Sequence, residues 1–226
     1  KVEAGRLEIH PEISVPATVV EEVRALVAPR AAEKGLALRI HVEPGVPGGV
    51  VLDAARLRQI LVNLVGNAIK FTEAGAVEVR VACERRSGAE RCGDLVFTVA
   101  DTGRGIPDDF KARLFGAFEQ LPGQDHAKYG GTGLGLAISQ RLARLMNGEI
   151  TVADAPAGSG SVFTLRLKAV AVTGPPCESE TEDDWSGRVM FRDPPRVLMV
   201  DEDASSRELV RSYLEPYGFE VVEAAD

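Results

Sequence analysis

The predicted helix over residues 53–72 constrains the fold more than any other stretch of the chain. It starts at Asp53, a residue type that caps helix N-termini well. Apolar residues then recur at helical spacing and predict one buried stripe, made of Leu57, Ile60, Leu61, Leu64, Val65 and Ala68. A rotation of about 100° per residue gathers polar residues on the opposite side, namely Gln59, Asn63, Asn67 and Lys70. We therefore expect an amphipathic helix whose apolar side lies in a core.

The polar side of this helix is unusual for a surface that only meets water. Asn costs about 0.6 kcal/mol relative to Ala in a helix interior, so a solvated side normally carries Glu, Lys and Arg. Asn63 and Asn67 lie one turn apart, and Lys70 follows about one turn later. Amide oxygens are ligands for a hard cation, and an ammonium group attracts an anion. A metal-bound polyphosphate needs both, while a solvated helix side remains the alternative from this stretch alone.

Composition and charge exclude several classes of protein. The chain has 226 residues, of which 45% are hydrophobic and 27% charged, and this suits one or two globular domains. A net charge of −8 argues against a nucleic-acid partner. No apolar run approaches the roughly 18 residues of a membrane span, so we expect no membrane contact by this segment. The chain begins at Lys1 without a signal-peptide pattern, which favours a cytoplasmic piece of a longer protein whose membrane anchor, if it has one, lies upstream.

Cysteine and histidine residues give no sign of a metal or disulfide framework. The three cysteines form no Cys-x-x-Cys pair, and three thiols cannot all pair within one chain, so reduced thiols are expected. The three histidines are isolated from other metal ligands at helical spacing and are interpreted as incidental; they are His10, His41 and His126.

The first quarter of the chain reads as alternating helices and strands. Residues 1–6 resemble the tail of a helix ended by Gly5, and residues 7–9 a short strand. A helix is predicted over residues 16–34, ending before Gly35, with a stripe of Val19, Val20, Val23, Leu26 and Val27. A strand over residues 36–42 follows, and a loop at residues 44–49 leads through residues 50–52 into the amphipathic helix.

After residue 72 the pattern changes to the period of a β-strand. Residues 77–81 and 95–99 alternate apolar and polar positions and are expected to be neighbouring antiparallel strands. A helix is predicted from Pro107 through Phe118, and another over residues 134–146. Strands are predicted at residues 150–153 and 162–167. This arrangement predicts an α+β fold, a two-layer α/β sandwich with a mixed, mostly antiparallel sheet.

The last quarter of the chain differs from what precedes it. Residues 169–195 contain paired prolines and an acidic cluster, which indicates a linker. Residues 197–200 predict a buried parallel strand that ends at Asp201 and Glu202. A helix through about residue 215 and a strand at residues 219–222 would follow. Residues 196–226 are thus expected to begin a flavodoxin-like α/β unit that is truncated at residue 226.

Two glycine-containing motifs add candidate chemistry. Asp101-Thr-Gly103-Arg-Gly105-Ile-Pro107 follows a strand, where glycines let backbone approach a flat ligand and a carboxylate can accept from an exocyclic amine. Residues 129–136, Tyr-Gly-Gly-Thr-Gly-Leu-Gly-Leu, enter a helix whose N–H groups can bind an anion. An ordinary turn and a flexible linker remain alternatives for the two motifs taken singly.

Taken in order, three motifs resemble the nucleotide-binding domain of sensor histidine kinases, within the wider family that includes DNA gyrase, Hsp90 and MutL. They are Asn-x₃-Asn-x₂-Lys at residues 63–70, Asp-x-Gly-x-Gly at residues 101–105 and Gly-Gly-Thr-Gly-Leu-Gly-Leu at residues 130–136. Phe115-Gly-Ala-Phe118-Glu-Gln is similar to the family's phenylalanine-containing box. The resemblance covers residues 7–168 and implies that the cofactors are ATP and Mg²⁺.

The resemblance also implies roles for individual residues. Asn67 would hold Mg²⁺ with ATP, Lys70 the phosphates and Asp101 the adenine amine. Gly103 and Gly105 would form the adenine wall. Gly131, Gly133 and Gly135 would bind phosphates under a lid at residues 120–130. The implied cofactor site also includes Phe71, Ile106, Phe118, Thr132, Leu134 and Leu136.

One departure from the wider family bears on the reaction. Asn63 stands where the ATPase members place a catalytic glutamate, and an amide is a poor base. Water activation would be weak, so the resemblance favours transfer to a protein side chain, with Asn63, Asn67 and Lys70 as the catalytic set. A nucleotide-binding signalling module without chemistry and an ATPase remain as alternative functions.

The resemblance implies partners outside this chain. The phosphoryl acceptor would be a His on an upstream helical dimerisation domain, in a setting that none of the three histidines has, so the chain alone is not expected to phosphorylate itself. Residues 1–6 resemble the end of that domain, and the parent is expected to be a homodimer. Residues 196–226 resemble the start of a response-regulator receiver domain in which Asp201 and Glu202 would bind Mg²⁺, with an acidic solvated loop as the alternative. The parent would then be a hybrid kinase that relays phosphate from ATP to His and on to Asp.

Overall fold

The computed structural model describes residues 8–85, 92–119, 133–156, 159–173, 196–200 and 220–224. They fall into two compact units, one within residues 1–179 and the other within residues 180–226. None of the helices in these described stretches is both long enough and apolar enough to cross a membrane.

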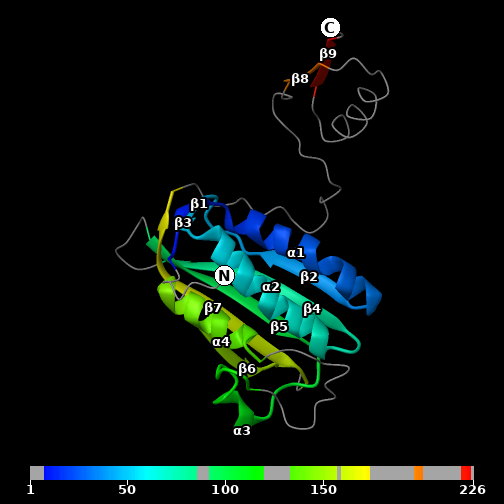
Figure 1. The fold of residues 1–226 in the computed structure, drawn as a ribbon, viewed down its shortest axis with the longest axis vertical. Helices are drawn as coiled ribbons and strands as arrows, with labels where there is room; N and C mark the ends of the chain where they lie inside the picture. The colour runs from blue at the N-terminus through cyan, green and yellow to red at the C-terminus, as the bar shows by residue number, and fades with distance from the viewer. Residues whose placement is uncertain are drawn as a thin grey trace, which may run out of the picture. The chain divides into compact units, whose positions relative to one another are not determined.

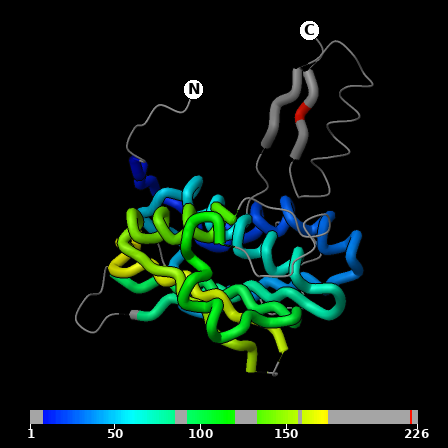
Figure 2. The backbone as a smooth tube through the Cα atoms, turned by 60° about the horizontal axis from the view of Figure 1, so that its bottom comes forward, coloured from blue at the N-terminus to red at the C-terminus, as the bar shows by residue number. Residues whose placement is uncertain are grey.

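The larger unit is a seven-stranded sheet with helices over one face (Figures 1 and 2). The helices are α1 (Pro16–Glu33), α2 (Ala54–Phe71), the short α3 (Asp108–Lys111) and α4 (Gly135–Leu145). The strands are β1 (Glu12–Ser14), β2 (Ala37–Val42), β3 (Val50–Leu52), β4 (Ala76–Arg85), β5 (Cys92–Asp101), β6 (Gly148–Asp154) and β7 (Ser161–Val172). Within the described residues of this unit, β2 and β4 pair in parallel and the other pairs are antiparallel. The predicted α+β architecture is confirmed.

The apolar side of α2 lies at the centre of the core. All six residues of the predicted stripe are at most 3% exposed, and they pack over inward-facing residues of the sheet such as Val79, Phe97 and Leu165. Asp53 caps the helix as predicted, because its Oδ1 accepts from the backbone N–H of Arg56 at 3.0 Å. Its Oδ2 accepts from the backbone N–H of His10 at 2.9 Å. The cap therefore also fixes the segment that leads into the unit.

Strand β7 connects the other parts of the sheet. It pairs with β5 along one side and with β6 along the other, and its last residues, Ala171 and Val172, pair with β3. The strand order is β1-β3-β7-β5-β4-β2, with β6 paired to β7 outside this path. β7 is longer than the predicted strand at residues 162–167, and it includes the first four residues of the expected linker.

The sheet face away from the helices carries ion pairs. Arg166 donates to both oxygens of Glu84, at 2.5 and 2.9 Å, and this hydrogen bonding is the main reason that the pKa of Glu84 is lowered. Lys168 lies 2.6 Å from Glu149, and its hydrogen bond lowers the pKa of that carboxyl. The unit therefore has two layers, with apolar residues between them and charged residues on the open face of the sheet.

The structure corrects the predicted start of the unit. A strand was expected at residues 7–9, but residues 8–11 are not in a strand. Leu7 lies outside the described residues. The strand lies at β1 instead, because β3 supplies its antiparallel partner, with Glu12 opposite Leu52. Residues 50–52, expected to lead into the helix as a connection, form β3.

Two further predictions about helices are wrong in detail. Leu26, predicted on the buried stripe of α1, is 60% exposed. At about 100° per residue it lies at the margin of the stripe that Val19, Val23 and Val27 define. The helix expected from Pro107 through Phe118 is only the four residues of α3. A tight turn follows it, in which the N–H of Gly116 donates to the carbonyl of Arg113 at 2.8 Å and Phe118 takes a φ of +63°.

The smaller unit shows two strands, β8 (Arg196–Val200) and β9 (Glu220–Ala224), which pair in parallel with Arg196 opposite Glu220. The parallel strands predicted at residues 197–200 and 219–222 are thus present within one or two residues of their expected bounds. The predicted intervening helix and both acidic residues, Asp201 and Glu202, lie outside the described residues, as does the helix tail expected at residues 1–6. Two parallel strands do not by themselves define a flavodoxin-like fold.

Candidate functional site

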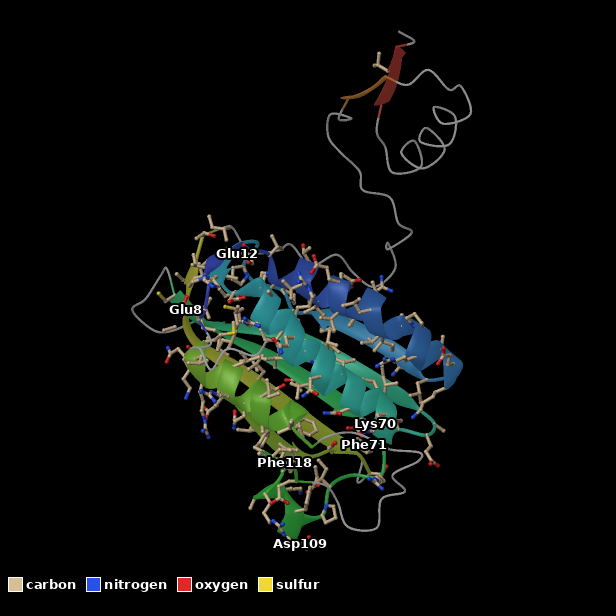
Figure 3. All side chains as sticks on the ribbon, viewed as in Figure 1. Glu8, Glu12, Lys70, Phe71, Asp109 and Phe118 are labelled. Carbon is tan, nitrogen blue, oxygen red and sulfur yellow. The ribbon has the colours of Figure 1, made fainter. Side chains whose placement is uncertain are left out.

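The C-terminal half of α2 is the place where the three sequence motifs meet. Figure 3 shows Lys70 and Phe71 at the C-terminal end of α2, with Phe118 toward the same end of the unit and Glu8 and Glu12 at the other. Asn63, Asn67 and Lys70 are all half-buried, unlike the stripe on the other side of the helix.

The loop after β5 packs against the end of α2. A Cβ on Gly103 would lie 2.6 Å from the carbonyl oxygen of Phe71, so only glycine allows this approach. Two cations lie close to the ring of Phe71, with Lys70 Nζ 5.0 Å and Arg104 Cζ 5.2 Å from its centroid. The first and second motifs are therefore in direct contact.

Asp101 is a buried carboxylate held in a fixed orientation. It ends β5 and is 5% exposed. Its Oδ1 accepts from the N–H of Gly103 at 2.8 Å, which is the ordinary Asp turn considered from the sequence, and its Oδ2 accepts from the Ser161 hydroxyl at 2.6 Å. Each carboxylate oxygen has a second lone pair. Asp101 can therefore still accept a hydrogen bond from a ligand.

Two glycines allow close backbone packing beside Asp101. Gly105 has a φ of +72°, and Gly160 has a φ of +107° with its Cα so near the backbone of Asp101 that a Cβ would meet the carbonyl oxygen at 1.9 Å. Ile106 packs against the core. The turn between β5 and α3 is thus fixed from both sides, by α2 and by the start of β7.

The third motif meets α2 through Asn63. Its Nδ2 donates to the hydroxyl of Ser139 on α4 at 2.9 Å. A Cβ on Gly135, the first residue of α4, would lie 2.4 Å from Asn63 Oδ1. The glycine therefore lets the amide lie directly against the start of α4, one helical turn from Asn67.

Residues on both sides of the segment 120–132 lie close together. The N–H of Phe118 donates to the carbonyl of Gly133 at 3.2 Å, and Gly133 has a φ of +70°. The side chain of Phe118 is 72% exposed. Leu134 is the N-cap of α4, and Leu136 packs against the core. Gly131, Thr132 and the lid predicted at residues 120–130 lie outside the described residues.

Lys70 is a cation in a partly desolvated place. Burial lowers the pKa of its ammonium group below the ordinary value, because desolvation penalises the charged form. A bound anion would offset that penalty and favour the charged form. Asn67 lies on the same side of α2, where its amide oxygen is a suitable ligand for a hard cation.

Four residues that the sequence reasoning missed make long-range contacts with the motif residues or with the elements that carry them. Lys34 Nζ donates to the carbonyls of Ile69, Lys70 and Thr72, at 2.8, 2.8 and 3.1 Å, and so satisfies the C-terminal end of α2. Gln140 exchanges two hydrogen bonds with the backbone of Ile150 in β6, at 2.9 and 3.1 Å. Ser139 and Ser161 bind the two motif residues already described. Each contact joins residues at least ten apart in the sequence, so no local pattern predicts it.

The residues at this site suit a metal ion that binds together with a phosphate ligand. Within the stretches that the structure describes, no three residues among His, Cys, Asp and Glu are grouped so as to hold a metal ion. Mg²⁺ commonly keeps several waters and binds through one or two protein oxygens together with phosphates. A single amide oxygen such as that of Asn67 fits this mode.

Comparisons with known proteins identify the family of the chain. The sequence matches the family described as histidine kinase-, DNA gyrase B-, and HSP90-like ATPase over residues 52–171. The sensor histidine kinase AruS of Pseudomonas aeruginosa is 39% identical over 214 residues, covering 92% of this chain and 20% of AruS. The signal transduction histidine-protein kinase BarA of Escherichia coli is 42% identical over 170 residues, covering 74% of this chain and 18% of BarA. Among solved structures, full-length ShkA in complex with AMPPNP matches with a TM-score of 0.62 and 31% identity, over 99% of this chain and 42% of ShkA. The chain spans about a fifth of the length of the two curated relatives.

Proposed function

Because the chain belongs to the histidine kinase-, DNA gyrase B-, and HSP90-like ATPase family and is the ATP-binding catalytic domain of a sensor histidine kinase, we propose that it transfers the γ-phosphoryl group of ATP to a His on a separate helical domain of its parent. The observation that carries this proposal is the convergence of the three motifs at the C-terminal half of α2. We place the domain in the cytoplasm, because its proposed phosphoryl donor is ATP.

The adenine end of ATP is assigned to the loop after β5. Asp101 would accept a hydrogen bond from the adenine amine through a lone pair that Gly103 and Ser161 leave available. Gly103, Gly105 and Ile106 would line the base, because glycines expose flat backbone there. Phe71 and Phe118 supply aromatic surface at the same end of the unit.

The phosphate end is assigned to α2 and the start of α4. Lys70 would pair with the phosphates, and the N–H groups at Gly133, Leu134, Gly135 and Leu136 would donate to them at a helix N-terminus. Gly131, Thr132 and a lid at residues 120–130 complete the assignment by the family resemblance. Asn67 would hold Mg²⁺, which when bound neutralises charge that develops on the phosphates.

Phosphoryl transfer depends mainly on positioning and on neutralising charge, and this set of residues can supply both. Asn63 is an amide, already hydrogen-bonded to Ser139, and is a poor base for activating water. Transfer to a protein side chain is therefore favoured over transfer to water, and we propose as the acceptor the His of an upstream dimerisation domain in a homodimeric parent.

We extend the proposal to residues 196–226 as the start of a receiver domain, joined by a linker within residues 169–195. The two parallel strands β8 and β9 support this assignment. Asp201 and Glu202 would bind Mg²⁺ there. The parent would relay the phosphoryl group from the His to a receiver Asp beyond residue 226.

Two measurements test the catalytic proposal. Titration with a fluorescent ATP analogue should show Mg²⁺-dependent binding by the wild type, and the Mg²⁺ dependence should be lost in Asn67→Ala. Mixing the chain with a separately made acceptor-helix domain and ATP should then give acid-labile phosphohistidine. ATP binding without any transfer to that domain would leave a nucleotide-binding signalling module and would contradict the kinase assignment.

The family description also covers ATPases. A substitution at Asn63 can distinguish a kinase from an ATPase. We expect slow hydrolysis by the isolated wild type and faster hydrolysis by Asn63→Glu, because a carboxylate can accept a proton from water. Rapid hydrolysis by the wild type would favour the ATPase.

A further inference from the structure

We propose that Ser139 is a positioning residue that, through Asn63, sets the distance between the two structural elements that hold the phosphates of the nucleotide. This inference rests on the proposed function and adds a residue to it. Ser139 lies outside the glycine motif, on the second turn of α4, and reaches the nucleotide site only through the Asn63 side chain.

The contact is well defined at both ends of the Asn63 amide. The nitrogen donates to the Ser139 hydroxyl at 2.9 Å, and Ser139 is 2% exposed, so water cannot easily replace the bond. The oxygen lies where a Cβ on Gly135 would be 2.4 Å away. The amide is therefore held between two residues of α4 that are one turn apart.

This contact fixes α4 against α2, whereas a second contact fixes α4 against the sheet. Gln140, the next residue, exchanges two hydrogen bonds with Ile150 of β6. The side chains of Ser139 and Gln140 thus bind different neighbours, α2 and β6. Of these two contacts, the one made by Ser139 joins α4 to the helix that carries Asn67 and Lys70.

The adenine end of the proposed site does not depend on this contact. Asp101 is oriented by Gly103 and by Ser161, which belong to the loop after β5 and to β7. Loss of the Ser139 hydroxyl should therefore displace the phosphate-binding elements while the adenine-binding group stays in place. A general loss of folding would instead weaken binding of every ligand together.

The test is a comparison of ligands on one set of variants. Ser139→Ala, Asn63→Ala and the double variant are titrated with a Mg²⁺-bound non-hydrolysable ATP analogue and, separately, with adenosine. We expect Ser139→Ala to weaken the triphosphate by about fivefold, the equivalent of one net hydrogen bond, and to leave adenosine affinity unchanged. The double variant should bind the triphosphate no more weakly than Asn63→Ala, because both changes remove the same interaction.

Two control variants distinguish the loss of the Ser139 contact from a general loss of stability. Ser14→Ala removes a buried hydroxyl in β1, and its side chain is 8% exposed. Gln140→Ala removes the two side-chain hydrogen bonds from α4 to β6. Both should keep the wild-type ratio of triphosphate to adenosine affinity, even where the melting temperature falls.

Several results would overturn the inference. They are an equal loss of affinity for both ligands in Ser139→Ala, additive effects of the two single variants, or unchanged triphosphate affinity in a correctly folded Ser139→Ala. A wild type that binds neither ligand would instead overturn the proposed function itself, so the two failures are distinguishable.

Discussion

The apolar and polar sides of α2 have opposite effects on the stability of the fold. The apolar side consists of six residues that are at most 3% exposed, and each removes hydrocarbon surface from water. The polar side places two asparagines in a helix interior and a lysine whose charge is partly desolvated. The first side stabilises the fold, and the second costs stability.

This difference indicates that one helix serves two separable purposes. Its apolar side fixes the position and direction of the helix on the sheet, and its polar side then presents amides and an ammonium group at a defined distance from the loop after β5. Variants on the apolar side should therefore change folding, and variants on the polar side should change binding.

The largest effect is expected from Leu61→Ala on the apolar side. Leu61 is fully buried, so its truncation should lower the free energy of unfolding by about 2–5 kcal/mol, measured by urea denaturation. The protein that stays folded should bind the ATP analogue with unchanged affinity. Leu26→Ala on α1 is the matched control, because Leu26 is 60% exposed and should cost much less. Equal losses in the two variants would contradict the assignment of the core.

The next effect is expected from Lys70→Met on the polar side. Loss of a charged hydrogen-bonding partner should weaken binding of the ATP analogue by about 1.5–3 kcal/mol, while the melting temperature should not fall. A large loss of stability with unchanged affinity would remove the distinction between the two sides.

The pH dependence of this residue has a definite sign. Because burial lowers the pKa of Lys70, the unfolded chain binds more protons than the folded one between the lowered pKa and the ordinary value. The free protein should therefore gain stability as pH rises through that window, while affinity for the ATP analogue falls as the ammonium loses its proton. Lys70→Arg should bind with little pH dependence over the same alkaline range, since a guanidinium stays charged. Identical pH profiles for wild type and Lys70→Arg would contradict this role.

A smaller effect is expected at the N-terminus of the same helix. Asp53→Ala should lower the free energy of unfolding by about 0.5–2 kcal/mol, because the N–H groups of Arg56 and His10 both lose their acceptor. Asp53→Asn keeps one acceptor oxygen and should lose less. Thermal melting of the three proteins measures the order, and Asp53→Asn melting at or below Asp53→Ala would contradict the double role of the carboxylate.

The smallest effect is expected on the open face of the sheet, which belongs neither to the core under α2 nor to the proposed nucleotide site. Arg166→Ala removes a partly exposed ion pair with Glu84 and should change stability by about 0–1 kcal/mol. The difference from wild type should shrink further in high salt. A salt-independent loss comparable to that of Leu61→Ala would show that this face is part of the core.

Sequence patterns predicted the parts of the fold that depend on local order. The stripe from Leu57 to Ala68 is regular over three turns and begins at a strong cap, and both features were correct. Alternation along β4 and β5 likewise predicted two antiparallel neighbours. In contrast, β1 and β3 are three residues each, and they are strands because they pair with each other and with β7. A segment this short has too little periodicity to be recognised alone.

The same limit applies to the candidate site. Asn63, Asn67 and Lys70 were selected because asparagine is costly in a helix interior and a lysine follows one turn later. Asp101 was selected because a carboxylate at the end of a strand, beside two glycines, can accept from an exocyclic amine. Lys34 and Ser139 are ordinary residues in ordinary helices, and they become informative only when the carbonyls of α2 and the amide of Asn63 lie beside them. Their partners are 35 or more residues away in the chain, so tertiary structure alone reveals them.

The position of β7 has a consequence for synthesis on the ribosome. A chain that has emerged only as far as β6 contains β1 and β3 as one potential ribbon and β2, β4 and β5 as another, with nothing to join them. The sheet can close only after Val172 has left the exit tunnel. Until then, the apolar surface that packs against β7 in the folded unit stays uncovered.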